Sequence, residues 1–409
     1  MGRTFKRPIN YPWVGLIVLA GGLSALYLGS ALYPGPINPD ALKYFSIEQA
    51  QRARIYNFVP RVLFITSFIL QATALIWLLF SRKGAQIAQR VEQRHRGHDW
   101  KNIFSYFFLL WFFLRLLRLP FTLFGNYYWQ QAWGFSSQSL GSWWLDYTKN
   151  ATIDLFLSTV SVLVFFLILK YCSKLWWVLV ATLFAVWLVL QTFLWPVIVS
   201  PMFNHFETVK DPAVINMVQD LAYKAGIEVD EVLVMDASKR TTMANAYFSG
   251  LGKTKQIVIY DNLLKNYPLD EVRAVLAHEI GHWQKGHIIL GLKLGILGAF
   301  LVWGLTAFFL SGFTPKSGHY RTQLWAGLQL FMLLIMMVTN PLQSYISRTM
   351  EKQADQVSLD LTGDASAVVR LQTDLATKNL ADVSPPEFIV WFEYTHPPVL
   401  SRIQAMVGH

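Results

Sequence analysis

The sequence has a single cysteine, Cys172, so it holds no internal disulfide and no metal cluster built from cysteine thiolates. Charged residues are also scarce. They make up 15% of the 409 residues, hydrophobic residues make up 54%, and the mean hydropathy is +0.34. A typical soluble domain has about 25% charged residues. This composition excludes an ordinary soluble enzyme and predicts an integral membrane protein.

Acidic residues are the scarcer charge: 25 Asp and Glu accompany 35 Lys and Arg, which gives a formal net charge of +10. Such a charge can serve nucleic-acid binding, but here the basic residues occupy short segments between apolar runs. Membrane topology explains that arrangement better. We therefore expect a lipid bilayer around the chain, no nucleic-acid partner, and a monomer.

Apolar runs long enough to cross a bilayer predict seven spans, at residues 11–33, 58–80, 103–124, 152–170, 175–199, 288–311 and 322–345. The first run is too long for a cleaved signal peptide. The connections 34–57, 81–102 and the Trp- and Tyr-rich 125–150 are predicted as loops, and Asn340-Pro341 as a break in the last span. Arg115 and Arg118 in the third span are expected to face protein or water, or to extend toward the span's end.

The less apolar parts are predicted to fold outside the bilayer. Between residues 201 and 287 we expect a helix at 211–225, a strand at 229–236 and a hairpin of 245–249 with 256–260. Two or three helices should follow residue 357, broken at two proline pairs. The predicted domains are a five-span region at 1–200, a zincin-like catalytic insert at 201–287, the last two spans at 288–345, and a C-terminal helical part at 346–409.

One motif points to chemistry, LAHEIGHW at residues 276–283. His278 and His282 are four residues apart, so on a helix both imidazoles lie on one face and can bind one cation. Glu279 follows directly, close enough to accept a proton from an attacking water. This HExxH pattern is typical of zinc metallopeptidases. The alternative is a soluble helix that carries the three residues by chance.

A catalytic zinc site usually has three protein ligands. The extended metzincin motif is excluded, because Lys285 and Ile288 occupy the places of its glycine and histidine. We predict Glu351 as the third ligand. Asp355, one helical turn later, would accept the free ring N–H of a ligand histidine.

Two alternatives to this assignment stay open. The segment that holds Glu351 and Asp355 also holds Arg348 and Lys352, so it can be an exposed helix with ion pairs. His287 is a rival third ligand, although on a straight helix it is out of line with His278 and His282. In the preferred assignment Arg348 lies just outside the ligand set.

Several segments together resemble the type I CaaX prenyl endopeptidases, which are integral-membrane zinc metalloproteases of the gluzincin type. The resemblance rests on HEIGHW, the later SRxxExxAD, and His396-Pro397, and extends to LPFTLF at 119–124, SPMFNHF at 200–206 and SKRTTMANAYFSG at 238–250. It covers about the last three quarters of the chain. Thr241-Thr242-Met243 departs from the serines and histidine expected there, and the first 100 residues match only loosely.

The resemblance implies an all-α membrane protein whose seven or so transmembrane helices enclose a chamber, with a small α+β zincin-like domain and one Zn²⁺ per chain. His396 would donate to the oxyanion, unless it merely caps a helix or faces solvent. Arg402, six residues on, is predicted to bind substrate. Asn245 and Ala246 would hold substrate as an added strand, or simply end a strand.

The substrates implied are CaaX-type prenylated tails, or similar peptides cleaved in membrane-protein quality control with no prenyl requirement. Two other classes compete with a protease. A transporter would fit seven spans with charges inside them, but the sequence has no paired halves with matching broken helices. A silent scaffold would be expected to have lost one of His278, Glu279, His282 or Glu351.

The membrane is either a bacterial inner membrane or one of the ER type. Thirteen Lys and Arg lie in the short segments on the side of the N-terminus, and four lie in the loops 34–57 and 125–150. By the positive-inside rule, the N-terminus is cytoplasmic and the catalytic insert faces the opposite side. The resemblance to eukaryotic CaaX proteases implies a cytosolic site instead.

Overall fold

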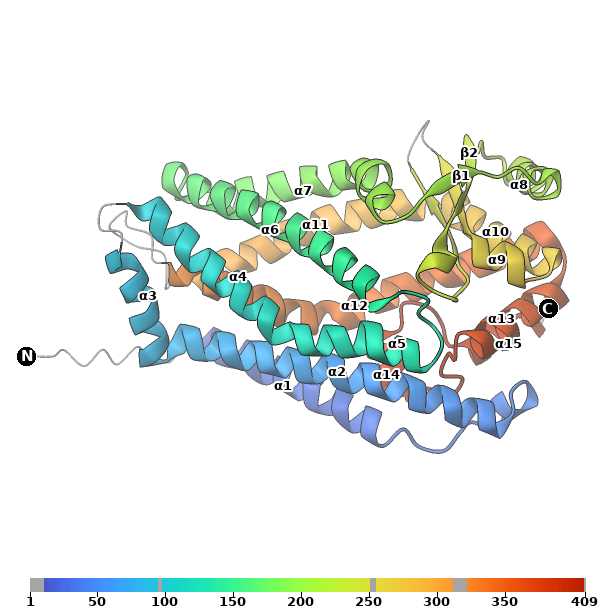
Figure 1. The fold of residues 1–409 in the computed structure, drawn as a ribbon, viewed down its shortest axis with the longest axis horizontal. Coiled ribbons are helices and arrows are strands. Elements are labelled where there is room, and N and C mark those ends of the chain that lie inside the picture. The colour runs from blue at the N-terminus through green and yellow to red at the C-terminus, as the bar shows by residue number, and fades with distance from the viewer. Residues whose placement is uncertain (1–10, 95–97, 251–254, 312–321, 408–409) are drawn as a thin grey trace, which may run out of the picture.

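The computed structural model describes residues 11–94, 98–250, 255–311 and 322–407. Within these ranges, seven helices are long and apolar enough to cross a membrane, as predicted. They contain α1 (Tyr11–Leu32), α2 (Ile47–Phe80), α4 (Asp99–Leu123), α6 (Leu140–Tyr171), α7 (Trp176–Leu194), α11 (His287–Leu310) and α12 (Gln323–Thr362). Figure 1 shows them along one long axis, with a sheet at one end and α3 (Arg82–Arg94) at the other.

Two predicted loops are helical. α2 begins at Ile47 rather than residue 58, because Ser46 caps it: the Gln49 N–H donates to Ser46 Oγ at 3.1 Å, and the Ser46 N–H to Gln49 Oε1 at 2.9 Å. This reciprocal capping box starts the helix before the apolar run begins. In the basic segment 81–102, α3 forms because Ala88 and Val91 lie on one side and are buried.

The aromatic segment 125–150 was also wrongly predicted as a loop. α4 continues through a π-helical turn (Phe124–Tyr128) into α5 (Trp129–Ala132), and α6 begins at Leu140. The Ser139 hydroxyl caps α6 by accepting from the Ser142 N–H at 3.2 Å. The connection therefore shrinks to residues 133–139.

The predicted break at Asn340-Pro341 is wrong, because α12 is one helix of 40 residues with Pro341 inside it. The Asn340 side chain instead donates to the Phe392 carbonyl at 2.7 Å. α12 also crosses the predicted domain boundary between residues 345 and 346. One rigid element thus extends from the bilayer to Glu351.

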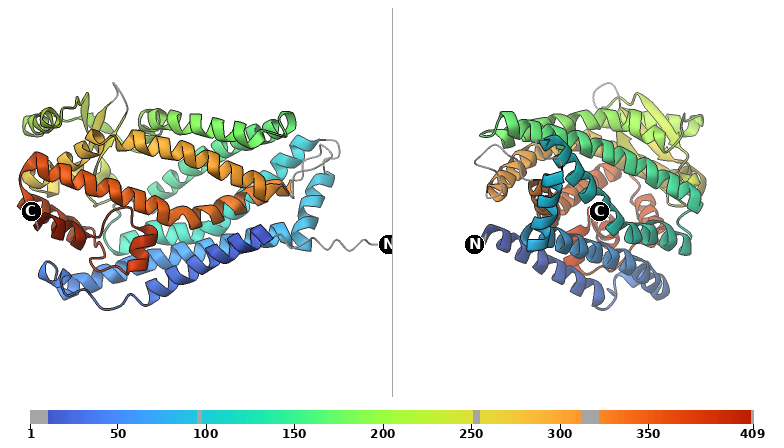
Figure 2. Two further views of the ribbon diagram at one scale, coloured as in Figure 1. Left: turned by 180° about the vertical axis from the view of Figure 1, so that it is seen from behind. Right: turned by 60° about the vertical axis from the view of Figure 1, so that its left-hand side comes forward.

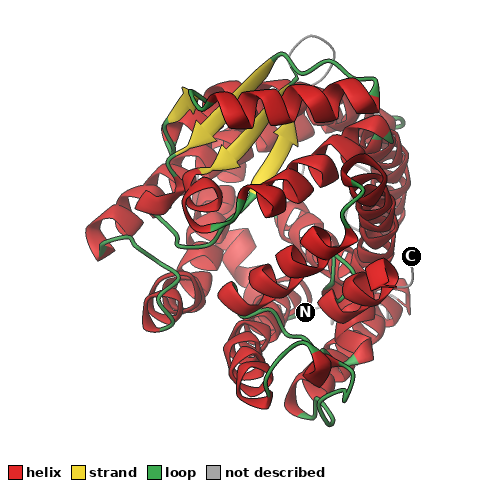
Figure 3. Ribbon diagram, turned by 90° about the vertical axis from the view of Figure 1, so that its right-hand side faces the viewer, coloured by secondary structure: helices red, strands yellow, loops and turns green. Residues whose placement is uncertain are grey.

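The domain outside the bilayer holds a four-stranded sheet in the order β1-β2-β4-β3. β2 (Glu231–Met235) is parallel to β4 (Gln256–Tyr260), and β1 (Phe206–Thr208) and β3 (Ala246–Ser249) are the antiparallel edges. The predicted strand, hairpin and helix α8 (Pro212–Ala225) are confirmed, whereas the three-residue β1 was missed. The hairpin turn, residues 251–254, lies outside the described ranges. Figure 3 shows the sheet beside the helices at this end.

The remaining helices complete this end of the molecule. α9 (Asp261–Asn266) and α10 (Leu269–Gln284) follow β4, and α13 (Ala365–Lys378), α14 (Glu387–Glu393) and α15 (Val399–Val407) follow α12. The last three agree with the predicted helices and with the breaks at the two proline pairs. α14 packs against α1 and α12.

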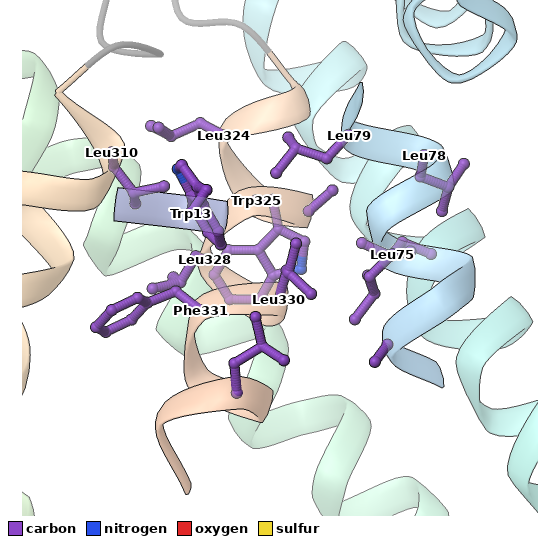
Figure 4. Packing of buried hydrophobic residues seen from close by; sticks show 14 of the residues in the cluster. Trp13, Leu75, Leu78, Leu79, Leu310, Leu324, Trp325, Leu328, Leu330 and Phe331 are labelled. Atoms are coloured by element: carbon purple, nitrogen blue, oxygen red, sulfur yellow. The ribbon is translucent and has the colours of Figure 1, made fainter. Parts of the chain in front are cut away.

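The two largest hydrophobic clusters of the described residues hold most of these parts together. The larger lies inside the bundle, where Trp13 of α1 is 1% exposed and donates its ring N–H to the Phe309 carbonyl of α11 at 3.1 Å. Figure 4 shows Trp13 among leucines and aromatic rings of neighbouring helices. The second core joins α8, α10, α13 and the sheet.

A cavity of about 550 Å³ lies between α2, α4, α6 and α12. Arg115 and Arg118 line it, so they face the inside of the bundle, as the cost of placing arginine in lipid predicts. Arg115 pairs with Asp154 of α6 at 3.1 Å. Figure 2 shows α1 and α2 along the edge of the bundle opposite α7 and the sheet.

Candidate active site

The HExxH segment lies in α10. Asp270 and Glu271 occupy its first turn, where the helix dipole favours negative charge. The side formed by Val272, Leu276 and Ile280 is fully buried in the core beside the sheet. The two motif histidines lie on an adjacent side and contact α12.

α10 and α12 cross almost backbone to backbone at Gly281. A Cβ there would lie 3.1 Å from the Ala354 carbonyl oxygen and 3.0 Å from Val357 Cβ, closer than ordinary contact. The crossing is also tied by Ser358 Oγ, which donates to the Ala274 carbonyl at 2.9 Å. The glycine of HEIGH therefore lets α12 approach until Glu351 reaches both histidines.

Three side chains converge at this crossing. His278 Nε2 lies 3.1 Å from His282 Nε2 and 3.2 Å from Glu351 Oε2, and His282 Nε2 lies 3.3 Å from Glu351 Oε1. Ligands placed tetrahedrally around zinc at about 2.0–2.1 Å are separated by roughly 3.3 Å. The separation of the two Nε2 atoms and the distance from each to a Glu351 oxygen are therefore close to those of a tetrahedral zinc site.

Asp355, one turn after Glu351, orients His278. Its Oδ1 lies 2.9 Å from His278 Nδ1, and Arg402 donates to both of its oxygens, with Arg402 Nε at 2.8 Å from Oδ2. The carboxylate can only accept, so the His278 proton belongs on Nδ1 and the Nε2 lone pair points at Glu351. Arg402 thus holds Asp355.

His282 has a different partner. Its Nδ1 lies 2.9 Å from Nδ1 of His287, whose Nε2 lies 2.9 Å from Gln353 Oε1. Gly286, with φ of 66°, separates α10 from α11 and turns the chain so that His287 comes back to His282. If His282 donates from Nδ1, His287 accepts at Nδ1 and donates from Nε2 to the amide oxygen. His287 therefore supports His282 and has no ring nitrogen left for the metal.

The three converging side chains can hold a cation. Both Nε2 atoms present lone pairs when their Nδ1 atoms carry the protons, and the buried Glu351 carboxylate lies beside both of them. Burial lowers the pKa of His278, but its hydrogen bonds to Asp355 and Glu351 raise it more, to about 9. The site thus attracts positive charge, and two imidazoles with one carboxylate fit a divalent metal such as zinc.

Glu279 points to the open edge of β3. The Phe248 backbone N–H donates to its carboxylate, and burial raises the pKa of Glu279 above its usual range. The Tyr260 N–H donates to the Asn245 carbonyl at 2.9 Å, so the carbonyl of Asn245 points toward β4. By the antiparallel alternation, the backbone groups of Ala246 and Phe248 then face the free edge.

His396 approaches from the segment before α15. Its Nε2 lies 3.4 Å from Glu351 Oε2, and its Nδ1 lies 3.1 Å from Thr395 Oγ1. If the hydroxyl donates to Nδ1, Nε2 carries the proton and faces the ligand cluster. Arg348 donates to the carbonyls of Val390 and Tyr394, at 2.8 and 2.6 Å, and so holds the backbone that leads to His396.

Comparison with known families agrees with this geometry. The family model for peptidase family M48 matches residues 208–409, and the model for the five membrane helices at the N-terminus of CAAX prenyl proteases matches residues 36–205. CAAX prenyl protease 1 of Saccharomyces cerevisiae is 32% identical over 313 residues, which are 71% of this chain and 69% of the yeast protein. The chain belongs to peptidase family M48. It is a membrane metalloprotease.

Other M48 relatives cover more of the chain. The uncharacterized metalloprotease YhfN of Bacillus subtilis is 28% identical over 378 residues, 89% of this chain and 87% of its own. The crystal structure of S. mikatae Ste24p matches with a TM-score of 0.80 and 25% identity over 96% of each chain. The similarity therefore covers both the bundle and the catalytic end.

The structure brings most predicted site residues of this M48 protein together. His278, His282 and Glu351 converge, and Asp355 contacts His278 as expected. Three placements differ from expectation. Arg402 binds Asp355, Arg348 binds backbone carbonyls, and the Asn245 carbonyl pairs with β4. The substrate-binding roles of Arg402 and Asn245 stay predictions.

Two features of the site were not predicted from the sequence. One is Phe248 at the strand edge, and the other is the support that His287 and Gln353 give to His282. The alternation of a hairpin strand could have indicated Phe248. Only the turn at Gly286 brings His287 back to His282, and nothing in the motif signals it.

We expect Glu351→Ala to abolish stoichiometric metal binding, because it removes one of three ligands. His287→Ala should keep one metal per chain but bind it about 10- to 100-fold more weakly, since it removes only a partner that orients His282. Chelator competition on the purified protein measures both. Tight metal binding by Glu351→Ala, or no metal binding by His287→Ala, would indicate that His287 rather than Glu351 is the third ligand.

Proposed function

We propose that the protein is a zinc endopeptidase that uses His278, His282 and Glu351 as ligands and Glu279 as the general base. One observation carries the proposal: three ligand side chains converge, with contacts of 3.1 to 3.3 Å between them, beside a buried glutamate that faces an open strand edge. Zinc bound there would polarise the scissile carbonyl and acidify the attacking water.

The chain's own residues supply the remaining steps. Ala246 and Phe248 hold the substrate backbone as an added strand, which sets the scissile bond beside Glu279. Glu279 accepts a proton from the attacking water and passes it to the leaving amine. His396 donates from Nε2 to the oxygen on which negative charge develops. Arg402 holds the Asp355 carboxylate, which in turn orients the imidazole of His278.

Peptide tails of membrane proteins are the proposed substrates, and CaaX-type prenylated tails are one class of them. The yeast relative carries the name CAAX prenyl protease 1. The cavity of about 550 Å³ within the bundle has a size typical of ligand pockets, which is roughly 300–1,000 Å³. A protease that accepts tails without a prenyl group, as in quality control, is the second candidate, and the charge bias favours it.

We propose that the catalytic end faces away from the cytoplasm. Basic residues gather at the opposite end of the bundle, where α3 alone contributes Arg82, Lys83, Arg90 and Arg94. Prenylated tails are made in the cytosol, so an outward-facing site favours peptides of membrane proteins in general.

Glu279→Gln should leave the fold and the metal content unchanged while lowering kcat by at least about 100-fold, because only the proton carrier is removed. Metal analysis, a thermal melt and a peptide-cleavage assay on one preparation test this. Cleavage within about twofold of wild type would contradict the role of Glu279.

The substrate proposal is tested with one peptide made with and without a farnesyl group on its cysteine. If general membrane-protein tails are the substrates, the two kcat/KM values should agree within about tenfold, or 1.4 kcal/mol. A preference above about 1,000-fold for the farnesylated peptide would contradict the quality-control assignment and favour CaaX processing.

Orientation is tested with single cysteines in a Cys172→Ser background, one at Arg90 of α3 and one at Tyr223 of α8, both exposed. In intact cells, an impermeant thiol reagent should label Tyr223→Cys and not Arg90→Cys. Both should be labelled after the membrane is permeabilised, which is the control. The reverse pattern in intact cells would place the catalytic end in the cytoplasm.

A further inference from the structure

His396 is carried by residues 380–396, a segment that we call the His396 segment. It contains α14 and joins α13 to α15. The His396 side chain is 59% exposed, and besides Glu351 its nearest hydrogen-bonding partner is the adjacent Thr395. Side-chain packing does not lock it. The position of its Nε2 therefore depends on how firmly the segment's backbone is held.

A buried arginine of the second span holds this segment. Arg61 of α2 is 6% exposed, and its guanidinium donates to Asp382 Oδ2 at 3.0 Å, Glu393 Oε1 at 3.0 Å and the Tyr394 hydroxyl at 3.1 Å. The Tyr27 hydroxyl of α1 donates to the other Glu393 oxygen. A buried guanidinium with three acceptors permits few other arrangements, because each lost partner leaves a desolvated charge.

Further bonds from α2 lie at the start of the same segment. Asn57 donates to the Leu380 carbonyl at 2.7 Å, and Arg54 to the Ser384 carbonyl at 3.0 Å. Among the described residues, Leu380 is the one non-glycine residue with a positive φ, 49°. Such a conformation costs free energy and persists only where its surroundings enforce it. α2 thus fixes both ends of the turn that begins the segment.

α12 holds the other side of the segment. Arg348 donates to the carbonyls of Val390 and Tyr394, and Asn340 donates to that of Phe392. Tyr394 is therefore held at two points. Its hydroxyl accepts from Arg61 of α2, and its carbonyl accepts from Arg348 of α12. Two residues later, His396 Nε2 lies 3.4 Å from Glu351 Oε2.

We propose that Arg61 is a positioning residue for His396. Through Asp382, Glu393 and Tyr394 it holds the His396 segment against α12, so that Nε2 is aimed at the place where the oxyanion develops. The first two spans are then part of the catalytic apparatus as well as membrane anchors. This inference rests on the proposed role of His396.

A purely structural role for Arg61 predicts different behaviour. Loss of a buried ion pair can destabilise the whole protein, and the damage would then be the same whether or not His396 is present. A positioning role acts through His396 alone, so it should vanish once that side chain is removed. A double-mutant cycle separates the two cases.

The experiment measures kcat, KM and zinc content for Arg61→Gln, His396→Ala and the double variant of the full-length protein. His396→Ala should lower kcat about 100-fold, as loss of an oxyanion donor does. Arg61→Gln should lower kcat about tenfold or more with KM and zinc content unchanged, because a misplaced group loses catalytic geometry. In the His396→Ala background, the same Arg61 substitution should change kcat less than about twofold.

A milder variant covers the case in which Arg61→Gln does not fold. Tyr394→Phe removes one hydroxyl from the network and should lower kcat by a factor of about three, again only when His396 is present. Tyr223→Phe, on the exposed surface of α8, and Arg90→Gln, on α3, are matched controls that should leave kcat unchanged.

Two results would overturn the inference in distinguishable ways. Equal losses in kcat with and without His396 would make Arg61 a structural residue, while the proposed roles of Glu279 and His396 stand. An unchanged kcat in His396→Ala would instead remove the proposed role of His396, and the inference with it.

Discussion

The close crossing of α10 and α12 is the constraint on which the site depends. At Gly281 the two helices approach to a distance that leaves no room for a side chain, and this brings a carboxylate of one helix between two imidazoles of the other. A tetrahedral metal site tolerates errors of only a few tenths of an ångström. Because α12 continues unbroken into the bundle, the membrane-spanning part sets the ligand geometry.

α12 has a second function in the same site. Glu351 faces the metal position, Asp355 orients His278, and Gln353 orients His287 and through it His282. All three lie within two turns of one helix, so a small rotation of α12 would disturb the ligand and both supports together. The His396 segment is held against the same helix by Arg348 and Asn340, so the proposed oxyanion donor is fixed to the same rigid element.

What the sequence could predict was local. His278 and His282 are a turn apart, and Glu351 and Asp355 are a turn apart, so periodicity indicated that each pair lies on one face of its helix. The role of His287 depended on a break at Gly286 that the straight-helix assumption excluded. The hydrogen bond from Arg61 to the Tyr394 hydroxyl joins residues more than 300 positions apart, and no local pattern records such a contact.

The errors in the helices have one physical origin. Hydropathy marks the part of a helix that lies in lipid, whereas capping and packing decide where the helix begins and ends. Arg52 and Arg54 made the start of α2 resemble a loop, although Ser46 and Gln49 carried the capping signal. Pro341 suggested a break in α12, yet the helix continues through it, and the Asn340 side chain donates to the Phe392 carbonyl.

The central claim is that one metal ion at the α10–α12 crossing performs the hydrolysis. Zinc titration of the chelator-stripped protein tests it most directly, with peptide cleavage followed at each addition. Activity should be absent in the stripped protein, rise linearly with added zinc and level off at one equivalent per chain. Full cleavage by the metal-free protein, or a plateau at two equivalents, would contradict the account.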